Sequence, residues 1–205
     1  MKPLLLLDPR TSLQPIHHDP RVGERVDVID LYDLPATDLT PYVGLVVTGM
    51  ADQELLWTQR HVVAGFLDQG NVVVFCGHLL HRWLPACAPF VPARITSFRD
   101  YAIHLVEPGP IFAGVDPDDL TFRRGVAGFF ARGHHPPPAG AQILATLAGG
   151  QPTTWIDRAT TRGTVFTHAG DMLGFVADPG STATRLAPQL LDWAVAQGSR
   201  PCRTC

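Results

Sequence analysis

Two side chains that can take part in nucleophilic chemistry each follow a run of strand-forming residues. Cys76 comes directly after residues 72–75, and His168 comes directly after residues 164–167. Parallel strands present their carboxyl ends at one edge of a sheet, and ligands of open α/β sheets bind in the crevice there. We therefore expect Cys76 and His168 at the same edge, near a pocket. A thiol at the start of a following helix would also gain from backbone N–H groups that stabilise the thiolate.

The elements that must position these side chains begin with apolar runs at residues 4–7, 43–47 and 72–75. Their hydrophobicity is continuous rather than alternating, which is typical of strands covered on both faces. A helix is predicted over residues 52–68, and Gly70 suits its C-terminal cap. The strand–helix–strand order implies a right-handed crossover. We predict that the three runs are adjacent parallel strands of an α/β fold with a mostly parallel sheet.

Further strands and one more helix are expected in the rest of the sequence. A short strand at 26–31 follows the first run, and a last amphipathic helix runs from about residue 181 to 196, capped by Ser181 or Thr182. Residues between 85 and 138 read as irregular apart from one strand. The remaining predicted strands cover residues 101–106, 142–147, 153–157 and 164–167, the last two as a hairpin.

The amino-acid composition indicates which class of protein this is. The chain has 205 residues, 45% hydrophobic and 17% charged, which suits one globular domain with a real core. We assign residues 1–197 to a single α/β domain and 198–205 to a mobile tail, whose Cys202 and Cys205 read as part of a disordered end rather than a redox or zinc motif.

Charge and hydropathy bear on partners and location. The formal net charge of −3 provides no basic field to hold nucleic acid or an anionic membrane. The first apolar run is too short for a signal peptide or a membrane span. We therefore expect a cytoplasmic location, a small-molecule ligand as partner, no nucleic acid and no membrane, and we allow for a homodimer.

Three blocks, in order, resemble the class I glutamine amidotransferase-like superfamily, and within it the trehalose-utilisation (ThuA-like) group. The first is the strand 44–47 with Thr48-Gly49 and a helix that ends at Gly70; the second is 72–75 with Cys76-Gly77-His78; the third is the hairpin through 162–167 with His168-Ala169-Gly170-Asp171. The resemblance spans most of the chain and implies a flavodoxin-like three-layer sandwich.

The resemblance also implies catalytic roles. In the catalytic amidotransferases a cysteine on a tight turn attacks an amide, and a histidine after a later strand acts as base with an acid to orient it. By similarity, Cys76 would be the nucleophile, His168 the base and Asp171 the acid, with the N–H groups of Gly77 and His78 as oxyanion donors. The local pattern departs from Gly-x-Cys-x-Gly, and the acid stands three residues after the histidine rather than two.

The alternative is a non-catalytic ligand-binding or complex-assembly module, because ThuA-like relatives often lack the triad and a fold does not dictate chemistry. Cys76 would then be a buried strand-end residue that behaves as a small hydrophobe. Gly49, Gly77 and His78 would line a cleft for a sugar-like or anionic ligand. Thiol reactivity separates the two hypotheses.

A glycine- and phenylalanine-rich segment at residues 122–135 supplies further candidates. Arg124, Arg132 and His134 could place charged and polar groups over the cleft, where a guanidinium recognises a carboxylate or a phosphate. In the competing interpretation the loop is structural, Phe129 and Phe130 pack on the sheet, and the arginines point to solvent.

Metal and cofactor chemistry receive little support from the sequence. His78 and His81 have i, i+3 spacing and could join Cys76 and other histidines in a metal site, but no second fixed pair accompanies them. No glycine-rich phosphate loop follows a strand. We expect no metal and no cofactor.

Overall fold

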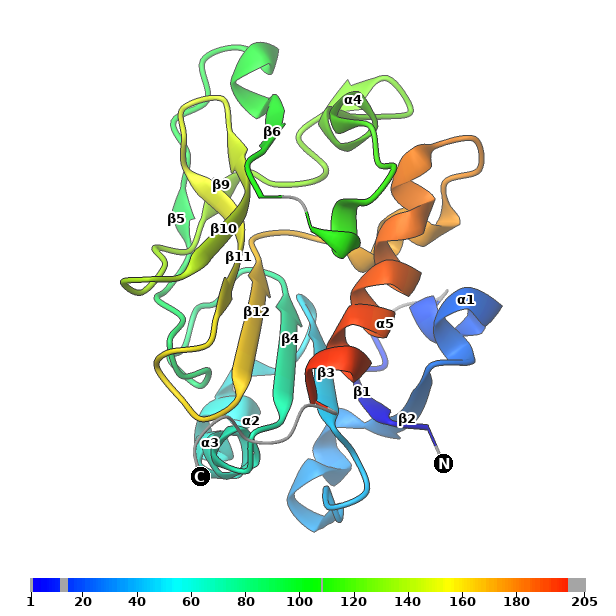
Figure 1. The fold of residues 1–205 in the computed structure, drawn as a ribbon, viewed down its shortest axis with the longest axis vertical. Coiled ribbons are helices and arrows are strands. Elements are labelled where there is room, and N and C mark those ends of the chain that lie inside the picture. The colour runs from blue at the N-terminus through cyan, green and yellow to red at the C-terminus, as the bar shows by residue number, and fades with distance from the viewer. Residues whose placement is uncertain (1, 12–14, 108, 199–205) are drawn as a thin grey trace.

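The apolar runs of the sequence form the centre of one large sheet, in a computed structural model that describes residues 2–11, 15–107 and 109–198. Within those residues the strand order is β2-β1-β3-β4-β12-β11-β10-β6 (Figure 1). Neighbouring strands from β2 to β12 run parallel. They are β2 (Val26–Asp30), β1 (Leu4–Asp8), β3 (Gly44–Thr48), β4 (Val72–Cys76) and β12 (Thr164–His168).

An antiparallel extension completes the sheet on the β12 side. It consists of β11 (Pro152–Asp157), β10 (Gln142–Leu147) and β6 (Ile103–Leu105). The hairpin predicted from the last two strand runs is β11–β12. Short ribbons lie outside this sheet: β5 (Val91–Pro92) pairs with β9 (Gly133–His134), and β7 (Phe122–Arg123) pairs with β8 (Val126–Ala127).

The prediction of three adjacent parallel central strands is confirmed. β3 lies between β1 and β4, and Leu45 is in register with Leu5 on one side and Val73 on the other. These three side chains are fully buried. Strands covered on both faces need apolar residues at every position, which is why the runs are continuous.

Helices cover both faces of the sheet. The α-helices are α1 (Pro20–Gly23), α2 (Gln53–Thr58), α3 (Arg60–Asp68), α4 (Pro117–Thr121) and α5 (Leu186–Gly198). The 3-10 helices are η1 (Ile16–His18), η2 (Leu31–Ala36), η3 (Phe98–Tyr101), η4 (Pro110–Phe112), η5 (Leu173–Ala177) and η6 (Thr182–Arg185).

The single helix predicted over residues 52–68 is two helices, α2 and α3, that meet at Gln59. Asp52 caps the first, accepting hydrogen bonds from the N–H groups of Glu54 and Leu55. At the break, the Thr58 hydroxyl donates to the Leu55 carbonyl at 2.7 Å. Such a local side-chain bond competes with the helical ladder and favours an end there.

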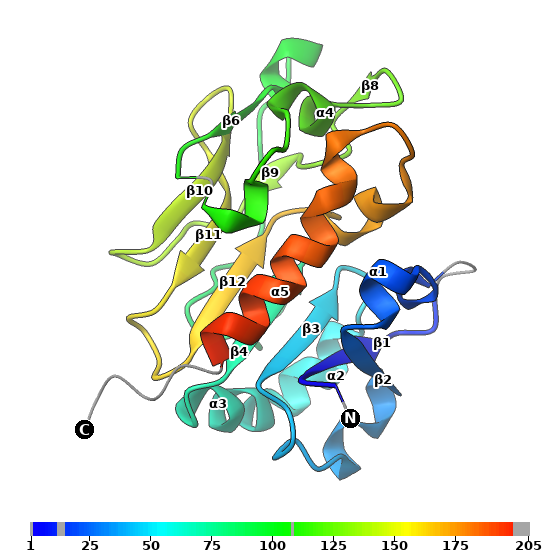
Figure 2. The same cartoon turned by 45° about the vertical axis from the view of Figure 1, so that its right-hand side comes forward.

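Alternate side chains of each central strand enter two separate cores. On β4, Val72, Val74 and Cys76 face the core under α5, whereas Val73 and Phe75 face the core under α2 and α3. Figure 2 shows α5 crossing one face of the sheet, with α2 and α3 on the other. The result is the three-layer α/β sandwich that the sequence predicts.

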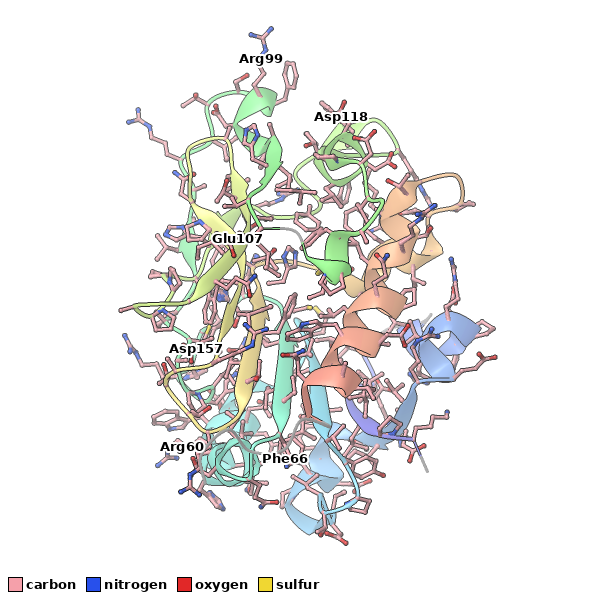
Figure 3. All side chains as sticks on the ribbon, viewed as in Figure 1. Arg60, Phe66, Arg99, Glu107, Asp118 and Asp157 are labelled. Carbon is pink, nitrogen blue, oxygen red and sulfur yellow. The ribbon has the colours of Figure 1, made fainter. Side chains whose placement is uncertain are left out.

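Side-chain positions agree with this layering (Figure 3). Phe66 of α3 is buried in the second core, whereas Arg99 and Asp118 are exposed at the outer end of the molecule. Within the described residues, no helix has both the length and the apolar character to cross a membrane. The predicted tail at 198–205, including Cys202 and Cys205, lies outside the described residues except for Gly198, the last residue of α5.

Packing on the α5 face predicts a large difference between two phenylalanines. Phe166 is 0% exposed and contacts Trp193 of α5, with 5.7 Å between ring centroids, whereas Phe98 is 60% exposed. Phe166→Ala should lower the free energy of unfolding by about 3–5 kcal/mol, because it removes buried contacts and leaves a cavity. The matched control Phe98→Ala should change it by less than about 1 kcal/mol. Urea unfolding of both variants checks this, and equal effects would contradict the layered core.

Candidate functional site

A cavity of about 390 Å³ opens at the carboxyl edge of the parallel strands. Its lining includes the last residue of three strands: Asp8 of β1, Thr48 of β3 and Cys76 of β4. Gly170 and Asp171, which follow β12, line it as well. Because all these strands run in the same direction, their ends bring residues from distant parts of the sequence to one crevice.

Two predicted site glycines, Gly49 and Gly77, line the cavity and also shape it. A Cβ added to Gly49 would lie 3.0 Å from the Cα of Gly77, and a Cβ added to Gly77 would clash with the backbone of Gly49. The turns that leave β3 and β4 can approach this closely only because neither residue has a side chain. These glycines therefore set the shape of the cavity floor.

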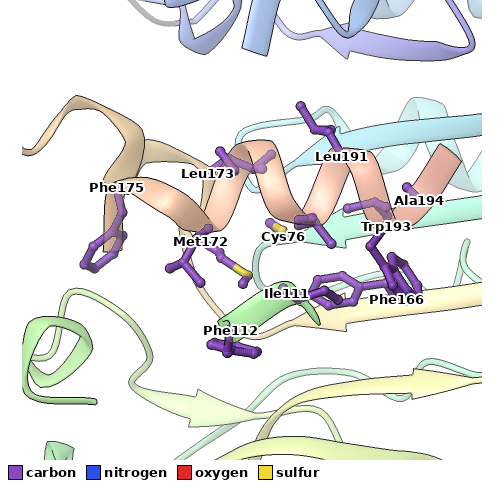
Figure 4. Close-up of a cluster of buried hydrophobic side chains, with 14 of the residues drawn as sticks. Cys76, Ile111, Phe112, Phe166, Met172, Leu173, Phe175, Leu191, Trp193 and Ala194 are labelled. Carbon is purple, nitrogen blue, oxygen red and sulfur yellow. The ribbon is translucent and has the colours of Figure 1, made fainter. Parts of the chain in front are cut away.

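Cys76 lies at the boundary between the cavity and the core. Its residue is 2% exposed, and Figure 4 shows its sulfur near that of Met172 among apolar side chains packed against α5. Burial raises the pKa of the Cys76 thiol well above its usual value, and the negative charge of Asp171 raises it further. A hydrogen bond from the Met172 N–H opposes these effects. The thiol is therefore protonated at neutral pH.

The helix expected directly after Cys76 is absent, which corrects the sequence analysis. Within residues 77–90, all of which are described, the chain forms turns and bends. Gln53 of α2 holds this loop: its amide donates to the His78 carbonyl at 2.7 Å and accepts from the N–H groups of Leu80 and His81. Helix-dipole stabilisation of a Cys76 thiolate is consequently unavailable.

His168 is the most completely enclosed polar residue of the predicted site. It is 0% exposed, its Nε2 lies 2.9 Å from the Phe130 carbonyl oxygen, and its Nδ1 lies 2.8 Å from the Thr154 hydroxyl. A carbonyl can only accept, so Nε2 carries the proton and Nδ1 accepts from Thr154. Burial lowers the pKa of His168 to about 3, although the bond to the Phe130 carbonyl opposes the shift. The imidazole is neutral, and both nitrogens are engaged.

The structure brings Cys76 and His168 to neighbouring strands without joining them. They are register partners of β4 and β12, at the same edge of the sheet. Among the described residues, however, neither side chain forms a hydrogen bond with the other. The N–H of Gly77 donates to the His168 carbonyl at 2.9 Å, so this expected oxyanion donor is used in the backbone.

Asp171 does not orient His168, since Thr154 occupies that position. One carboxylate oxygen of Asp171 accepts the N–H of Gly174 at 2.9 Å and so fixes the start of η5. The Asp171 residue is exposed and lines the cavity. Its location suits contact with a ligand better than support of an imidazole.

The segment from 122 to 135 does not supply the expected arginines to the cavity. Arg124 and Gly125 have φ values of 51° and 80° and connect β7 to β8, the geometry of a two-residue hairpin turn with both central residues left-handed. Arg124, whose side chain is 74% exposed, forms an ion pair with Asp178 at 3.1 Å. Arg132 donates to the Gly128 carbonyl at 2.9 Å. Neither Arg124 nor Arg132 lines the cavity.

The two phenylalanines of this segment have different environments. Phe130 is buried and packs on His168 with 4.3 Å between ring centroids, while Phe129 is exposed. Phe130 therefore closes the core over His168, as the structural interpretation of the loop predicted, whereas Phe129 does not pack on the sheet.

Only one of the two histidines predicted to bind a ligand lines the cavity. His78 lines the cavity and stacks on Phe90 with 3.7 Å between ring centroids. Burial, together with the positive charge of Arg132, lowers the pKa of His78. His134 belongs to the β5–β9 ribbon, in register with Val91, and does not line the cavity.

Several lining residues were missed by the sequence analysis: Asp8, Thr48 and His17. Asp8 ends the first apolar run, so its position at a strand end was the available signal. No such signal marked His17, which reaches the cavity from the short helix η1. Among the described residues, no group of three or more histidine, cysteine or acidic side chains is arranged to hold a metal ion.

A thiol–imidazole contact does occur on the opposite face of the sheet, between Cys87 and His135. Cys87 Sγ is 3.4 Å from Nδ1 of His135, and His135 Nε2 accepts the N–H of Leu79. Burial raises the pKa of Cys87 to about 12 and lowers that of His135 to about 4. Neither residue lines the cavity, so this pair serves to anchor the loop after β4.

Comparisons with known proteins support the fold and go no further. No family model and no curated protein matches the sequence. The structure is similar to that of α-L-fucosidase isoenzyme 2 from Paenibacillus thiaminolyticus, with a TM-score of 0.51 and 14% identity over 95% of this chain and 33% of that chain. A β-galactosidase from the psychrophilic Marinomonas ef1 gives a TM-score of 0.39 and 14% identity over 95% of this chain and 29% of that one. The chain thus spans about a third of the length of the solved structures it resembles.

The enclosed His168 predicts that stability falls with acidity. Its pKa is about 3 when folded and about 6.5 when unfolded, so between these values the unfolded chain binds a proton that the folded protein does not. The free energy of unfolding should therefore decrease as the pH falls below 6.5. His168→Gln should lose about 1.5 kcal/mol less than the wild type between pH 6.5 and 5.

Urea unfolding at both pH values measures this difference. The exposed His104 provides the control, since His104→Gln should retain the wild-type pH dependence. A His168→Gln variant with the wild-type slope would show that His168 is not held neutral in the fold.

A second prediction concerns the arginines paired with Asp178. The Arg123 side chain is 22% exposed, forms an ion pair with the nearly buried Asp178 and donates to the Gly174 carbonyl at 3.0 Å. Arg123→Gln should destabilise the fold by about 2–3 kcal/mol because it leaves buried acceptors poorly paired. Arg124→Gln should cost less than about 1 kcal/mol, since its side chain is in solvent. Thermal unfolding distinguishes them, and equal losses would contradict this assignment.

Proposed function

We propose that this chain is a non-catalytic small-molecule-binding domain of the class I glutamine amidotransferase-like superfamily, close to its ThuA-like group. The binding site is the cavity at the carboxyl ends of β1, β3, β4 and β12. The observation that carries the proposal is the state of His168: its two nitrogens are committed to Thr154 and Phe130, beside a cavity that is open to a ligand.

Support for the superfamily comes from the order of elements around the site. Cys76 and His168 end the neighbouring parallel strands β4 and β12, which are the locations of the nucleophile and base in the catalytic amidotransferases that the sequence resembles. The parallel sheet with helices on both faces agrees with the same assignment.

Support for binding comes from the size and composition of the cavity. A volume of about 390 Å³ lies in the range of small-molecule sites, which are mostly apolar with a few polar groups. Leu6, Ile16 and Met50 contribute apolar wall, and Thr48 and Asp171 contribute polar groups.

The thiol-enzyme alternative requires groups that the site does not offer. A cysteine nucleophile needs a base to take its proton or an environment that lowers its pKa. Here the pKa of Cys76 is raised, and the lone pair of His168 already accepts from Thr154. Hydrolysis through Cys76 would need a lower pKa for its thiol and a nitrogen of His168 that is free to accept the proton.

Thiol titration and an activity assay test the proposal together. The background should carry Cys202→Ser and Cys205→Ser, which removes the terminal thiols from the count. With an aromatic disulfide reagent at pH 7, Cys76→Ala should show the same reactive thiols as its parent while folded. It should show one fewer after unfolding in guanidinium, because Cys76 is then exposed.

Release of ammonia from glutamine should be equal in the parent and in Cys76→Ala. A fast-reacting thiol or glutamine hydrolysis that disappears in both Cys76→Ala and His168→Gln would overturn the non-catalytic assignment. A screen of small molecules by amide chemical shifts tests binding itself, with Thr48, Gly77 and Asp171 as the reporting amides. Hits whose shifts all lie elsewhere would place the function outside this cavity.

A further inference from the structure

The cavity has an unusual charge balance for a site that was expected to accept a sugar-like or anionic ligand. Two lining residues, Asp8 and Asp171, carry carboxylates, and no lysine or arginine lines the cavity among the described residues. Nor does either carboxylate form an ion pair with a described basic side chain. The lining therefore has a formal charge of −2 unless its histidines compensate.

The two lining histidines do not compensate. Burial lowers the pKa of His17, although the negative charge of Asp8 opposes the shift, and burial together with the positive charge of the nearby Arg132 lowers the pKa of His78. Both imidazoles are consequently neutral at pH 7. His17 also has a buried Nδ1 without a hydrogen-bond partner among the described residues.

The two carboxylates lie on opposite sides of the cavity in the sheet order. Asp8 ends β1 and Asp171 follows β12, with β3 and β4 between them. One oxygen of Asp8 accepts the Arg10 N–H at 3.0 Å, and one oxygen of Asp171 accepts the Gly174 N–H. These backbone bonds fix the direction of each carboxylate, while the charge remains uncompensated.

The remaining wall of the cavity is largely apolar. Leu6, Pro9, Pro15, Ile16 and Met50 line it together with the thiol of Cys76. A metal ion would need three or more converging ligands of suitable type, and the described residues provide no such group. Apolar walls instead suit the carbon body of an organic molecule.

We propose that the cavity selects a small organic cation, namely a protonated amine carried on an apolar body. This inference rests on the proposed binding function and names its ligand class. The ammonium group lies in the negative field of the Asp8 and Asp171 carboxylates, and the apolar body packs on the wall beside Met50 and Ile16. An anion is excluded because it would meet two uncompensated carboxylates in a partly enclosed site.

Three probes with nearly the same body and different charge test the selectivity: benzylamine, benzyl alcohol and benzoate. Each is titrated at pH 7 and low salt, and amide shifts of Thr48, Gly77 and Asp171 report occupancy. Benzylamine should bind about tenfold more tightly than benzyl alcohol, and benzoate should not bind. Raising the salt concentration should weaken the binding of benzylamine selectively.

Carboxamide variants assign the effect to the two residues. Asp8→Asn and Asp171→Asn should each weaken benzylamine binding about three- to tenfold and leave benzyl alcohol unchanged, because only the charge is removed. Asp118→Asn is the matched control, since Asp118 is exposed on α4 and does not line the cavity (Figure 3). It should leave every affinity at the wild-type value.

The possible failures are distinguishable. If benzyl alcohol or benzoate shifts the cavity amides with an affinity equal to or above that of benzylamine, the cation inference is wrong and the binding function stands. Benzylamine binding that is unaffected by both carboxamide variants would overturn the inference in the same way. If none of the probes shifts the cavity amides, both the ligand class and the proposed function fail.

Discussion

Burial of both faces of the central parallel strands is the constraint on which the rest of the structure depends. Because β1, β3 and β4 send alternate side chains into two cores, polar residues are tolerated only where the strands end. Asp8, Thr48 and Cys76 stand at those ends, in equivalent positions of neighbouring or nearby strands. The cavity with its polar groups is thus a direct consequence of how the sheet is buried.

His168 also stands at the end of a central strand, but it is buried instead of lining the cavity. The loop at 122–135 covers it, and Phe130 packs against its ring. A buried imidazole must satisfy both nitrogens, and Thr154 on β11 and the Phe130 carbonyl provide the partners. These bonds tie together two strands and the loop. His168, which the sequence presents as a base, therefore links these elements in the fold.

The sequence predicts the fold well because short continuous apolar runs bounded by turn residues are typical of strands covered on both faces. For the same reason it predicts that Cys76 and His168 end strands at the same edge of the sheet. The sequence does not show the environment of each side chain. Thr154 meets His168 only because β11 pairs with β12, and Gln53 of α2 holds the loop after Cys76 by hydrogen bonds between distant segments. Arg124-Gly125 between two short strand segments could have been read as a hairpin turn rather than a ligand-binding element.

What separates a binding site from a thiol enzyme in this fold is a small number of contacts rather than its topology. Register partners on parallel strands are adjacent, so the thiol of Cys76 and the imidazole of His168 already occupy neighbouring positions. Two hydrogen bonds and the packing of Phe130 leave His168 without a free nitrogen that could accept a proton. Burial beside Asp171 keeps the thiol of Cys76 protonated. The same Asp171 charge that disfavours a thiolate favours a cation in the cavity. One feature that opposes a thiolate at this edge, the negative charge of Asp171, is therefore also one on which the proposed cation site rests.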